Sequence, residues 1–285
     1  MVKILTKFYI CSLVISALFF CGCNIDFLGF IVSNDLDERL LEKDNFIFLD
    51  GKKSDGTTRN WRNLNLDTHD NYSFIVLTDT HIEGDKAYGF ERLYQKITPD
   101  IKFAAVLGDI TQNGAAADLE TFIKIADSLG IPCYPVIGNH DVYFTNWPEW
   151  KTRIGSTNYR IDSVDKNTTL LFLDSANSFF GQKQLDWLET QLKNTGENVF
   201  VFTHSPLFVK GPASMQQITD YRERSRIVSM LRNRCDIMFT GHSHKHLENE
   251  TGNVRYVNIE DFKSSQVYCV VTVNGSSITY KFEKL

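Results

Sequence analysis

The chain has 285 residues, of which 42% are hydrophobic and 23% are charged, the balance of an ordinary globular protein with room for one large domain or two small ones. Its formal net charge is −5, with no long run of one sign, which argues against a protein that holds nucleic acid by its phosphates. We therefore expect no specific nucleic-acid partner, whereas a small anionic substrate is compatible because a bound metal can supply local positive charge.

The first residues have the pattern of a secretory signal. Two lysines precede an almost unbroken apolar run from Phe8 to Phe20, and Gly22 stands directly before Cys23. This junction resembles a bacterial lipoprotein signal, in which the cysteine becomes the lipidated first residue. We expect residues 1–22 to be a signal peptide and Cys23 to anchor an exported protein in a membrane of the bacterial cell envelope. The alternative is an uncleaved membrane anchor, although the run is short for a full span.

Residues 23–70 are mixed in character, and we expect them to form a linker and a peripheral lead-in. The charged DLDERLLEKD is followed by FIFLDG and then by the polar KKSDGTTRNWRN. After this segment, short apolar runs recur at regular intervals along the chain. We therefore place a single domain over residues 71–285.

Short apolar runs alternate with stretches of helical spacing in that domain. The predicted strands are 73–79, 103–109, 133–139, 169–175, 198–204 and 236–242, and the clearest predicted helices are 116–130 and 181–195. This alternation predicts an α/β core in which both faces of the sheet are covered. After His246, the segments VRYVNIE, QVYCVVTV and SSITYKFE alternate in polarity and meet Asn-Gly-Ser turns, which predicts antiparallel β-sheet.

Side chains able to bind a metal or move a proton follow these strands at once. They are Asp79 and His81 in LTDTH, Asp109 in LGD, Asn139, His140 and Asp141 in IGNHD, His204 in FTHSP, and His242 and His244 in FTGHSH. Ligands of open α/β sheets bind beyond the C-terminal ends of strands, so these loops should gather along one rim. Taken singly, a loop histidine is usually solvated, Asp109 could cap a helix and Asn139 could sit in a turn. Their joint occurrence favours a shared site.

The residue types indicate the chemistry of that site. Carboxylate oxygens together with imidazole nitrogens suit Mn, Fe, Zn or Ni. Residues two apart on an extended backbone face the same way, so Asp79 with His81, and His242 with His244, would flank ions. Asp109 can bridge two ions through its two oxygens. Two ions held in this way would clamp the attacking and leaving oxygens of an in-line displacement at phosphorus.

The chain carries, from Asp79 to His244, the motifs D-x-H, G-D, G-N-H-D, a later H and G-H-x-H in this order. Together they resemble the signature of the calcineurin-like metallophosphoesterases. The resemblance implies an α/β fold of two packed mixed β-sheets flanked by helices, with two divalent transition-metal ions, Mn, Fe or Zn. The implied ligands of one ion are Asp79, His81, Asp109 and His244. Those of the other are Asp109, Asn139, His204 and His242. The resemblance also implies that His140 is the acid beside the substrate and that Asp141 orients it.

Two departures narrow the choice within the family. Purple acid phosphatases carry a tyrosine where this chain has Gln112, and the lipid A precursor hydrolases carry an arginine where it has His140. Within the family, the chain is therefore most similar to the small phosphodiesterases whose best-known members open cyclic nucleotides. The implied reaction is hydrolysis of a small phosphodiester, or phosphomonoester, by in-line attack of a metal-bridging hydroxide.

Two other functions stay open at this point. One is a phosphomonoesterase of the same fold, and the other is a surface lipoprotein that uses the scaffold for binding only. The complete ligand set argues against the second, since a protein that only binds has no need of His140. The aromatic residues of VYFTNWPEW, which follow the third motif, have two interpretations, core packing or a lip that stacks on a base or a lipid.

Overall fold

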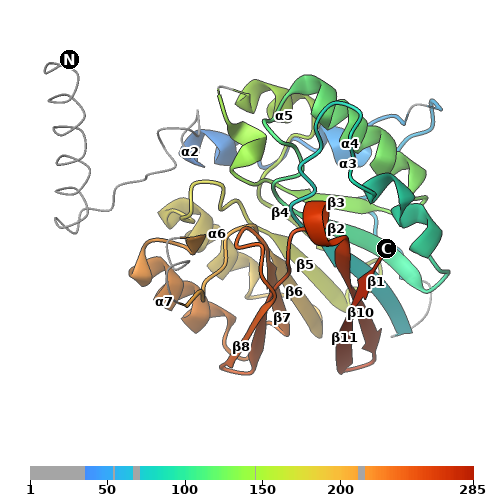
Figure 1. The fold of residues 1–285 in the computed structure, drawn as a ribbon. Coiled ribbons are helices and arrows are strands. Elements are labelled where there is room, and N and C mark those ends of the chain that lie inside the picture. Colours follow the sequence, from blue (N-terminus) through green and yellow to red (C-terminus); the bar gives the residue numbers. More distant parts are fainter. Residues whose placement is uncertain (1–35, 54, 67–70, 145, 211–215) are drawn as a thin grey trace, which may run out of the picture.

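The computed structural model describes residues 36–53, 55–66, 71–144, 146–210 and 216–285 (Figure 1). The predicted signal peptide and the predicted lipid attachment at Cys23 lie outside these residues. In the part of the chain that is described, no helix is long and apolar enough to cross a membrane.

Two mixed β-sheets form the centre of the molecule, with strand orders β11-β10-β1-β2-β3 and β4-β5-β6-β7-β9-β8. The strands of the first sheet are β1 (Asn71–Leu77), β2 (Ile101–Leu107), β3 (Cys133–Val136), β10 (Val267–Asn274) and β11 (Ser277–Lys284). Those of the second are β4 (Tyr159–Asp162), β5 (Thr168–Phe172), β6 (Asn198–Phe202), β7 (Ile237–Thr240), β8 (Leu247–Thr251) and β9 (Val254–Asn258).

Helices cover the outer faces of the two sheets. Figure 1 shows α3, α4 and α5 beside the first sheet and α6 and α7 beside the second. The α-helices are α2 (Leu36–Arg39), α3 (Ile47–Asp50), α4 (Ala116–Ser128), α5 (Trp147–Arg153), α6 (Gln182–Gln191), α7 (Tyr221–Leu231) and α8 (Phe262–Ser265). The 3₁₀ helices are η2 (Leu40–Glu42), η3 (Phe90–Lys96) and η4 (His140–Val142). This confirms the predicted α/β fold of two mixed sheets flanked by helices.

The second sheet buries both of its faces, which explains why its central strands are continuous apolar runs. Successive side chains of a strand point to opposite faces. Phe172, Phe202 and Phe239 belong to the large core cluster that lies between the sheets, and their rings stack at 4.9 and 5.8 Å. Their neighbours Val201 and Met238 belong instead to the cluster shared with α6 and α7. A strand between two such layers has no position for a polar residue until it ends.

The six predicted strands are confirmed as β1, β2, β3, β5, β6 and β7, and the two predicted helices as α4 and α6. The C-terminal region is only in part antiparallel. β8 pairs with β9 and β10 with β11 in antiparallel hairpins, but β9 runs parallel to β7. β10 joins the first sheet, antiparallel to β1. The C-terminal strands therefore complete both sheets, a long-range pairing that alternation within one segment cannot reveal.

The described part of residues 23–70 is not a peripheral lead-in. It contributes these side chains to the large core cluster: Phe48, Leu49, Trp61, Leu64 and Leu66. The guanidinium of Arg39 lies 2.7 Å from the carboxylate of Asp174, and both side chains are fully buried. Composition misled the prediction here, because apolar side chains spaced among charged ones still pack when a neighbouring surface receives them.

Candidate metal centre

The predicted ligands meet where loops of the two sheets converge. β1, β2 and β3 run parallel to one another, as do β6 and β7, so the C-terminal ends of each group share one edge. Asp79 and His81 follow β1, Asp109 follows β2, and Asn139 opens the turn into η4 after β3. His204 follows β6, and His242 and His244 follow β7. The parallel arrangement thus brings together residues that are far apart in the chain.

Five of these residues have a left-handed backbone, which non-glycine residues rarely adopt. Their φ angles are 55° at Asp79, 45° at His81, 46° at Asp109, 64° at His242 and 54° at His244. Each strand has ended before its ligand is reached, so alternation along an extended strand does not place these side chains, contrary to our expectation. Strained conformations of this kind persist where surrounding structure enforces them, and they gather at functional sites.

Glycines precede three of the ligands, Asp109, Asn139 and His242, because the loops approach each other closely. Gly108 has φ of 80°, and a Cβ there would lie 2.6 Å from the ring of His204. A Cβ at Gly241 would lie 1.9 Å from Oγ1 of Thr78. Any larger residue at either position would push the β6 or β1 loop away from the site.

Asp79, His81 and His244 form the first cluster of potential ligands. Oδ1 of Asp79 lies 3.1 Å from Nε2 of His244 and 3.8 Å from Nε2 of His81. The other carboxylate oxygen, Oδ2, accepts hydrogen bonds from the hydroxyl of Thr78 and from the backbone N–H of His242. These bonds hold Oδ1 toward the imidazoles.

Asp109, His204 and His242 form the second cluster. Nε2 of His204 lies 3.3 Å from Oδ2 of Asp109 and 3.1 Å from Nδ1 of His242. Oδ1 of Asn139 lies 3.2 Å from the same Nε2. On the far side of the His204 ring, Nδ1 donates to the carbonyl of Leu107 at 2.7 Å, and this bond leaves the Nε2 lone pair directed at the site.

Asp109 connects the two clusters. With His81 and His140 it forms a further group whose ligand atoms all lie within 4.8 Å of one another. Its side chain is almost fully buried, and Oδ1 accepts the backbone N–H of His140 at 2.9 Å. The described structure therefore brings all seven predicted ligands together, with Asp109 between the two sets.

The clusters fit divalent metal ions. Both ring nitrogens of His81 are buried and have no hydrogen-bond partner among the described residues. Leaving such groups unsatisfied is costly, so an ion that binds one of these nitrogens would stabilise the site. The donors are carboxylate oxygen, amide oxygen and imidazole nitrogen, which suit Mn, Fe or Zn.

The charges of the site's own residues also favour a cation. Burial alone would raise the pKa of Asp79 and of Asp109. The hydrogen bond from His244 keeps the pKa of Asp79 below normal, and the charge on His204 keeps that of Asp109 below normal. Burial opposes the charge on His204, yet the two carboxylates raise its pKa to about 9. Burial lowers the pKa of His242 to about 4. Two carboxylates are thus balanced by imidazolium protons that a metal ion would displace.

His140 lies beside the clusters, and a backbone carbonyl holds the ring nitrogen that faces away from them. Nδ1 is 2.8 Å from the carbonyl oxygen of Gln112, and Nε2 lies 3.9 Å from Oδ2 of Asp109. A carbonyl only accepts, so Nδ1 carries a proton and Nε2 faces the site. The ring of Tyr143 packs against that of His140 with centroids 4.4 Å apart.

Asp141 does not orient the ring of His140, contrary to what the resemblance implied. Its carboxylate accepts the backbone N–H groups of Gly138 and Thr111, both at 2.8 Å, and the Thr111 hydroxyl at 2.9 Å. Burial, together with the charge of Asp109, raises the pKa of Asp141 to about 7. Asp141 therefore ties the loop after β2 to the loop after β3.

The sequence analysis missed the hydroxyl of Thr78, which bonds to Asp79, and three further groups of the site. Two are the backbone carbonyls of Leu107 and Gln112, which hold His204 and His140 and which side-chain patterns cannot indicate. The third is the hydroxyl of Tyr143, which accepts from Nδ2 of Asn139 at 2.6 Å. Its place in the aromatic cluster after G-N-H-D was the available signal. In that cluster, Trp147 and Trp150 are buried in the core.

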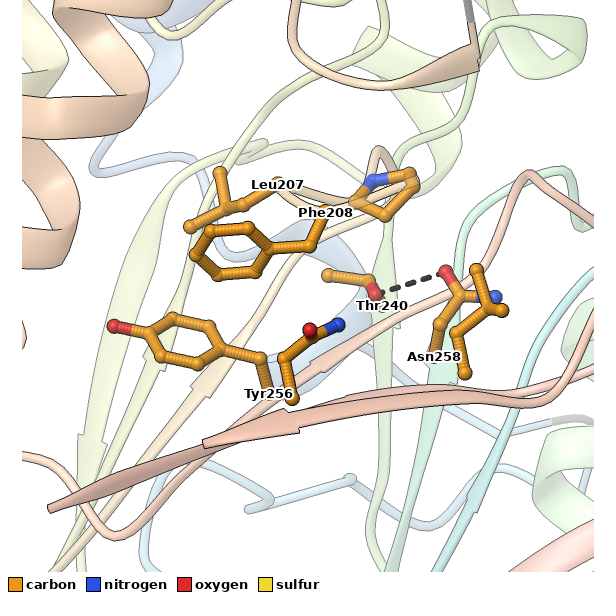
Figure 2. Close-up of a pocket in the computed structure, with 8 residues that line it drawn as sticks. Leu207, Phe208, Thr240, Tyr256 and Asn258 are labelled. Atoms are coloured by element: carbon orange, nitrogen blue, oxygen red, sulfur yellow. Dashed lines mark hydrogen bonds between the residues drawn. The ribbon is translucent and has the colours of Figure 1, made fainter. Parts of the chain in front are cut away.

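A small pocket shares two loops with the metal centre but contains none of its ligands. Its lining residues are Pro206, Leu207, Phe208, Thr240, Leu247, Asn249, Tyr256 and Asn258. Figure 2 shows the rings of Phe208 and Tyr256 side by side and the hydrogen bond from Thr240 to Asn258, 2.9 Å long. This bond joins the end of β7 to the end of β9, next to the loops that carry His204 and His242.

The fold and this cluster define a class of protein. The sequence profile of the calcineurin-like phosphoesterase family matches residues 72–246, more than half of the chain. The chain belongs to this family.

Among individual proteins, one from Fibrobacter succinogenes described as "Probable cyclic nucleotide phosphodiesterase" is 29% identical over 157 residues. The match covers 52% of this chain and 59% of that protein, so the chain spans less than two thirds of that relative. A dimetal phosphatase from Danio rerio is similar in structure, with a TM-score of 0.57 and 15% identity over 74% of this chain and 95% of that one. A purple acid phosphatase from yellow lupin is also similar in structure, with a TM-score of 0.61 and 11% identity over 76% of this chain and 52% of that one. These two likenesses concern the fold alone.

Proposed function

We propose that the protein hydrolyses a small phosphodiester at a centre that holds two divalent metal ions. The observation that carries the proposal is the position of Asp109. It lies between Asp79, His81 and His244 on one side and Asn139, His204 and His242 on the other. A carboxylate shared by two sets of nitrogen and oxygen donors is the arrangement expected for a pair of ions.

The bound ions would supply the positive charge that stabilises the attacking and leaving oxygens of a displacement at phosphorus. The protein's own residues hold the ligands and manage the proton. His204 is kept in the correct tautomer by Leu107, and Asp79 is turned by Thr78. His140 has its Nδ1 proton fixed by Gln112, so Nε2 is the atom that can carry a proton to the departing oxygen.

The family resemblance and the phosphodiesterase-like relative favour a diester as substrate. The tests are release of nitrophenol from bis-p-nitrophenyl phosphate and from p-nitrophenyl phosphate by the purified full-length protein loaded with Mn²⁺. Faster turnover of the diester supports the proposal, and faster turnover of the monoester supports a phosphomonoesterase. If metal-loaded protein hydrolyses neither, the scaffold serves binding only. Asp109→Ala, prepared in parallel, controls for contaminating phosphatases.

We also propose that the protein acts outside the cytoplasm, anchored through a lipid on Cys23. The support is the sequence of the first residues, in which a positive start and an apolar core lead to the Gly22-Cys23 junction. An exported enzyme would meet phosphoesters of the cell envelope or its surroundings.

A further inference from the structure

A half-buried cation stands near the metal centre with uncharged partners. Lys263, in α8, donates from Nζ to Oε1 of Gln112 at 3.0 Å. The same ammonium group lies 4.8 Å from the centroid of the Tyr88 ring. Among the described residues, no carboxylate forms an ion pair with Lys263. Neither an amide oxygen nor an aromatic ring cancels its charge.

Lys263 is fastened between two loops of the site. Its backbone N–H donates to the carbonyl of Asp79 at 3.1 Å. Its side chain reaches Gln112, whose own carbonyl holds Nδ1 of His140 at 2.8 Å. The ammonium group is therefore positioned by the loop that carries a metal ligand and by the loop that supports the acid.

A positive group in this place opposes the binding of metal ions nearby. Repulsion between like charges falls only gradually with distance at the effective dielectric of a protein surface. A neutral side chain could hydrogen-bond Gln112 without this repulsion. The charge becomes favourable once an anion enters the site, because the anion attracts the lysine and the ions together.

We propose that Lys263 binds a second negative charge on the substrate, in addition to the charge on the phosphoryl group that the ions would hold. This inference rests on the proposed phosphoesterase function. The shared chemistry is an anionic oxygen near the scissile phosphorus. Two kinds of substrate supply such an oxygen. A phosphomonoester supplies it as its second ionised oxygen, and a diester supplies it when its alcohol carries a carboxylate.

The test compares wild type with Lys263→Gln and Lys263→Arg as full-length, Mn²⁺-loaded proteins. Methyl p-nitrophenyl phosphate has one negative charge, and p-nitrophenyl phosphate near pH 8 has two. The p-nitrophenyl diesters of ethanol and of glycolate form a second pair, because the glycolate diester adds a carboxylate. Lys53→Gln is the matched control, since Lys53 also lies over an aromatic ring, that of Trp61, at 5.8 Å.

Loss of a hydrogen bond to a charged group costs about 1.5–3 kcal/mol, so Lys263→Gln should raise KM about 10- to 100-fold for substrates with the second charge. KM for the singly charged diesters should change less than about twofold, within the range of ordinary surface substitutions. Lys263→Arg should restore most of the loss. The pair that responds identifies the source of the charge. An equal change for all substrates, or a change matched by Lys53→Gln, would overturn the proposal.

Failure of the proposed function would be visible separately. If metal-loaded wild type turns over none of these esters, binding of inorganic phosphate is measured by calorimetry in wild type and Lys263→Gln. Weaker phosphate binding in the variant, by the same factor, would support the anion contact without hydrolysis. Equal affinities of the two proteins for phosphate, and also for phosphoglycolate, which carries the carboxylate as well, would refute the role of Lys263 whatever the protein's activity.

Discussion

The amide of Asn139 donates a hydrogen bond from Nδ2 to the hydroxyl oxygen of Tyr143, 2.6 Å away. This contact decides which end of the amide faces the second cluster, where Oδ1 lies 3.2 Å from Nε2 of His204. A metal ion binds the oxygen of an amide and not its NH₂ group. Tyr143 is thus a positioning residue that keeps Asn139 able to act as a ligand.

Tyr143→Phe should weaken metal binding while leaving the fold intact. The ring that packs on His140 remains, but Asn139 loses the partner that orients it. Loss of a group that orients a metal ligand typically lowers affinity about 10- to 100-fold. Titration with Mn²⁺, followed by the paramagnetic signal of the free ion, measures the change. Tyr88→Phe is the control, since the Tyr88 hydroxyl bonds to Glu83. Equal Mn²⁺ affinities in wild type and Tyr143→Phe would contradict the role assigned to Tyr143.

Asp109→Ala should reduce the metal content at both sites, because its carboxylate stands between the two clusters. His81→Ala should mainly reduce the content of one, since its nitrogens approach Asp79 and Asp109 but not His204. Elemental analysis after Mn²⁺ reconstitution and desalting gives the stoichiometry of each protein. Wild type should hold about two ions per chain, as expected for a dinuclear centre. A wild-type value near one would speak against the shared carboxylate.

His140→Ala should keep near-normal metal content and lose activity according to the leaving group. Nitrophenolate departs with little help, whereas an alkoxide needs a proton, and positioned acid catalysis contributes about 10²–10⁴-fold. We therefore expect a larger loss of kcat on alkyl esters than on nitrophenyl esters. The comparison uses one dialkyl and one nitrophenyl diester with the same metal-loaded protein. Loss of metal would make His140 a ligand, and equal loss on both esters would indicate stabilisation of phosphoryl charge.

Arg39→Ala should destabilise the protein strongly, because it leaves the carboxylate of Asp174 buried without its ionic partner. Breaking a buried pair in this way costs about 3–5 kcal/mol. An exposed pair offers a matched control, since Lys183 contacts Asp37 of the same helix α2 at 2.6 Å. Lys183→Ala should cost less than about 1 kcal/mol. Urea denaturation of the metal-free proteins measures both. Similar values for the two variants would show that α2 is not integral to the domain.

Cys23→Ala should abolish lipid attachment and leave an unprocessed or soluble form. The prediction follows from the signal pattern, in which the cysteine after Gly22 is the acylated residue. Cells grown with labelled palmitate should label the wild type and not the variant. The free cysteines Cys133, Cys235 and Cys269 are buried and offer no alternative acceptor in the folded domain. Equal labelling of both proteins would exclude lipidation at Cys23.

Local patterns carried much of the fold and of the site. Buried strands such as β2 and β6 are apolar on both faces, so they are visible as continuous runs in the sequence. Polar residues appear where those runs stop, and at Asp109 and His204 they proved to be members of one cluster. A pattern that repeats along a few residues needs no knowledge of distant partners.

Other features depend on contacts between distant segments. Arg39 contacts Asp174, which is 135 positions away in the sequence, and no pattern around either residue predicts the contact. Asp141 is next to His140 in sequence, yet its carboxylate turns to Thr111 and Gly138, because buried N–H groups there required an acceptor.

The sequence by itself determined which residue types would end the strands and that they suit a metal. The family resemblance implied how two ions would share them, and only the tertiary structure decided what holds each residue in its place. His242 and His244 belong to different clusters because left-handed turns, not an extended strand, direct them. Their conformation is imposed by the approach of the β1 loop to Gly241, where a Cβ would lie 1.9 Å from Thr78 Oγ1. Such an approach exists only once the two sheets have packed, so no local pattern can encode it.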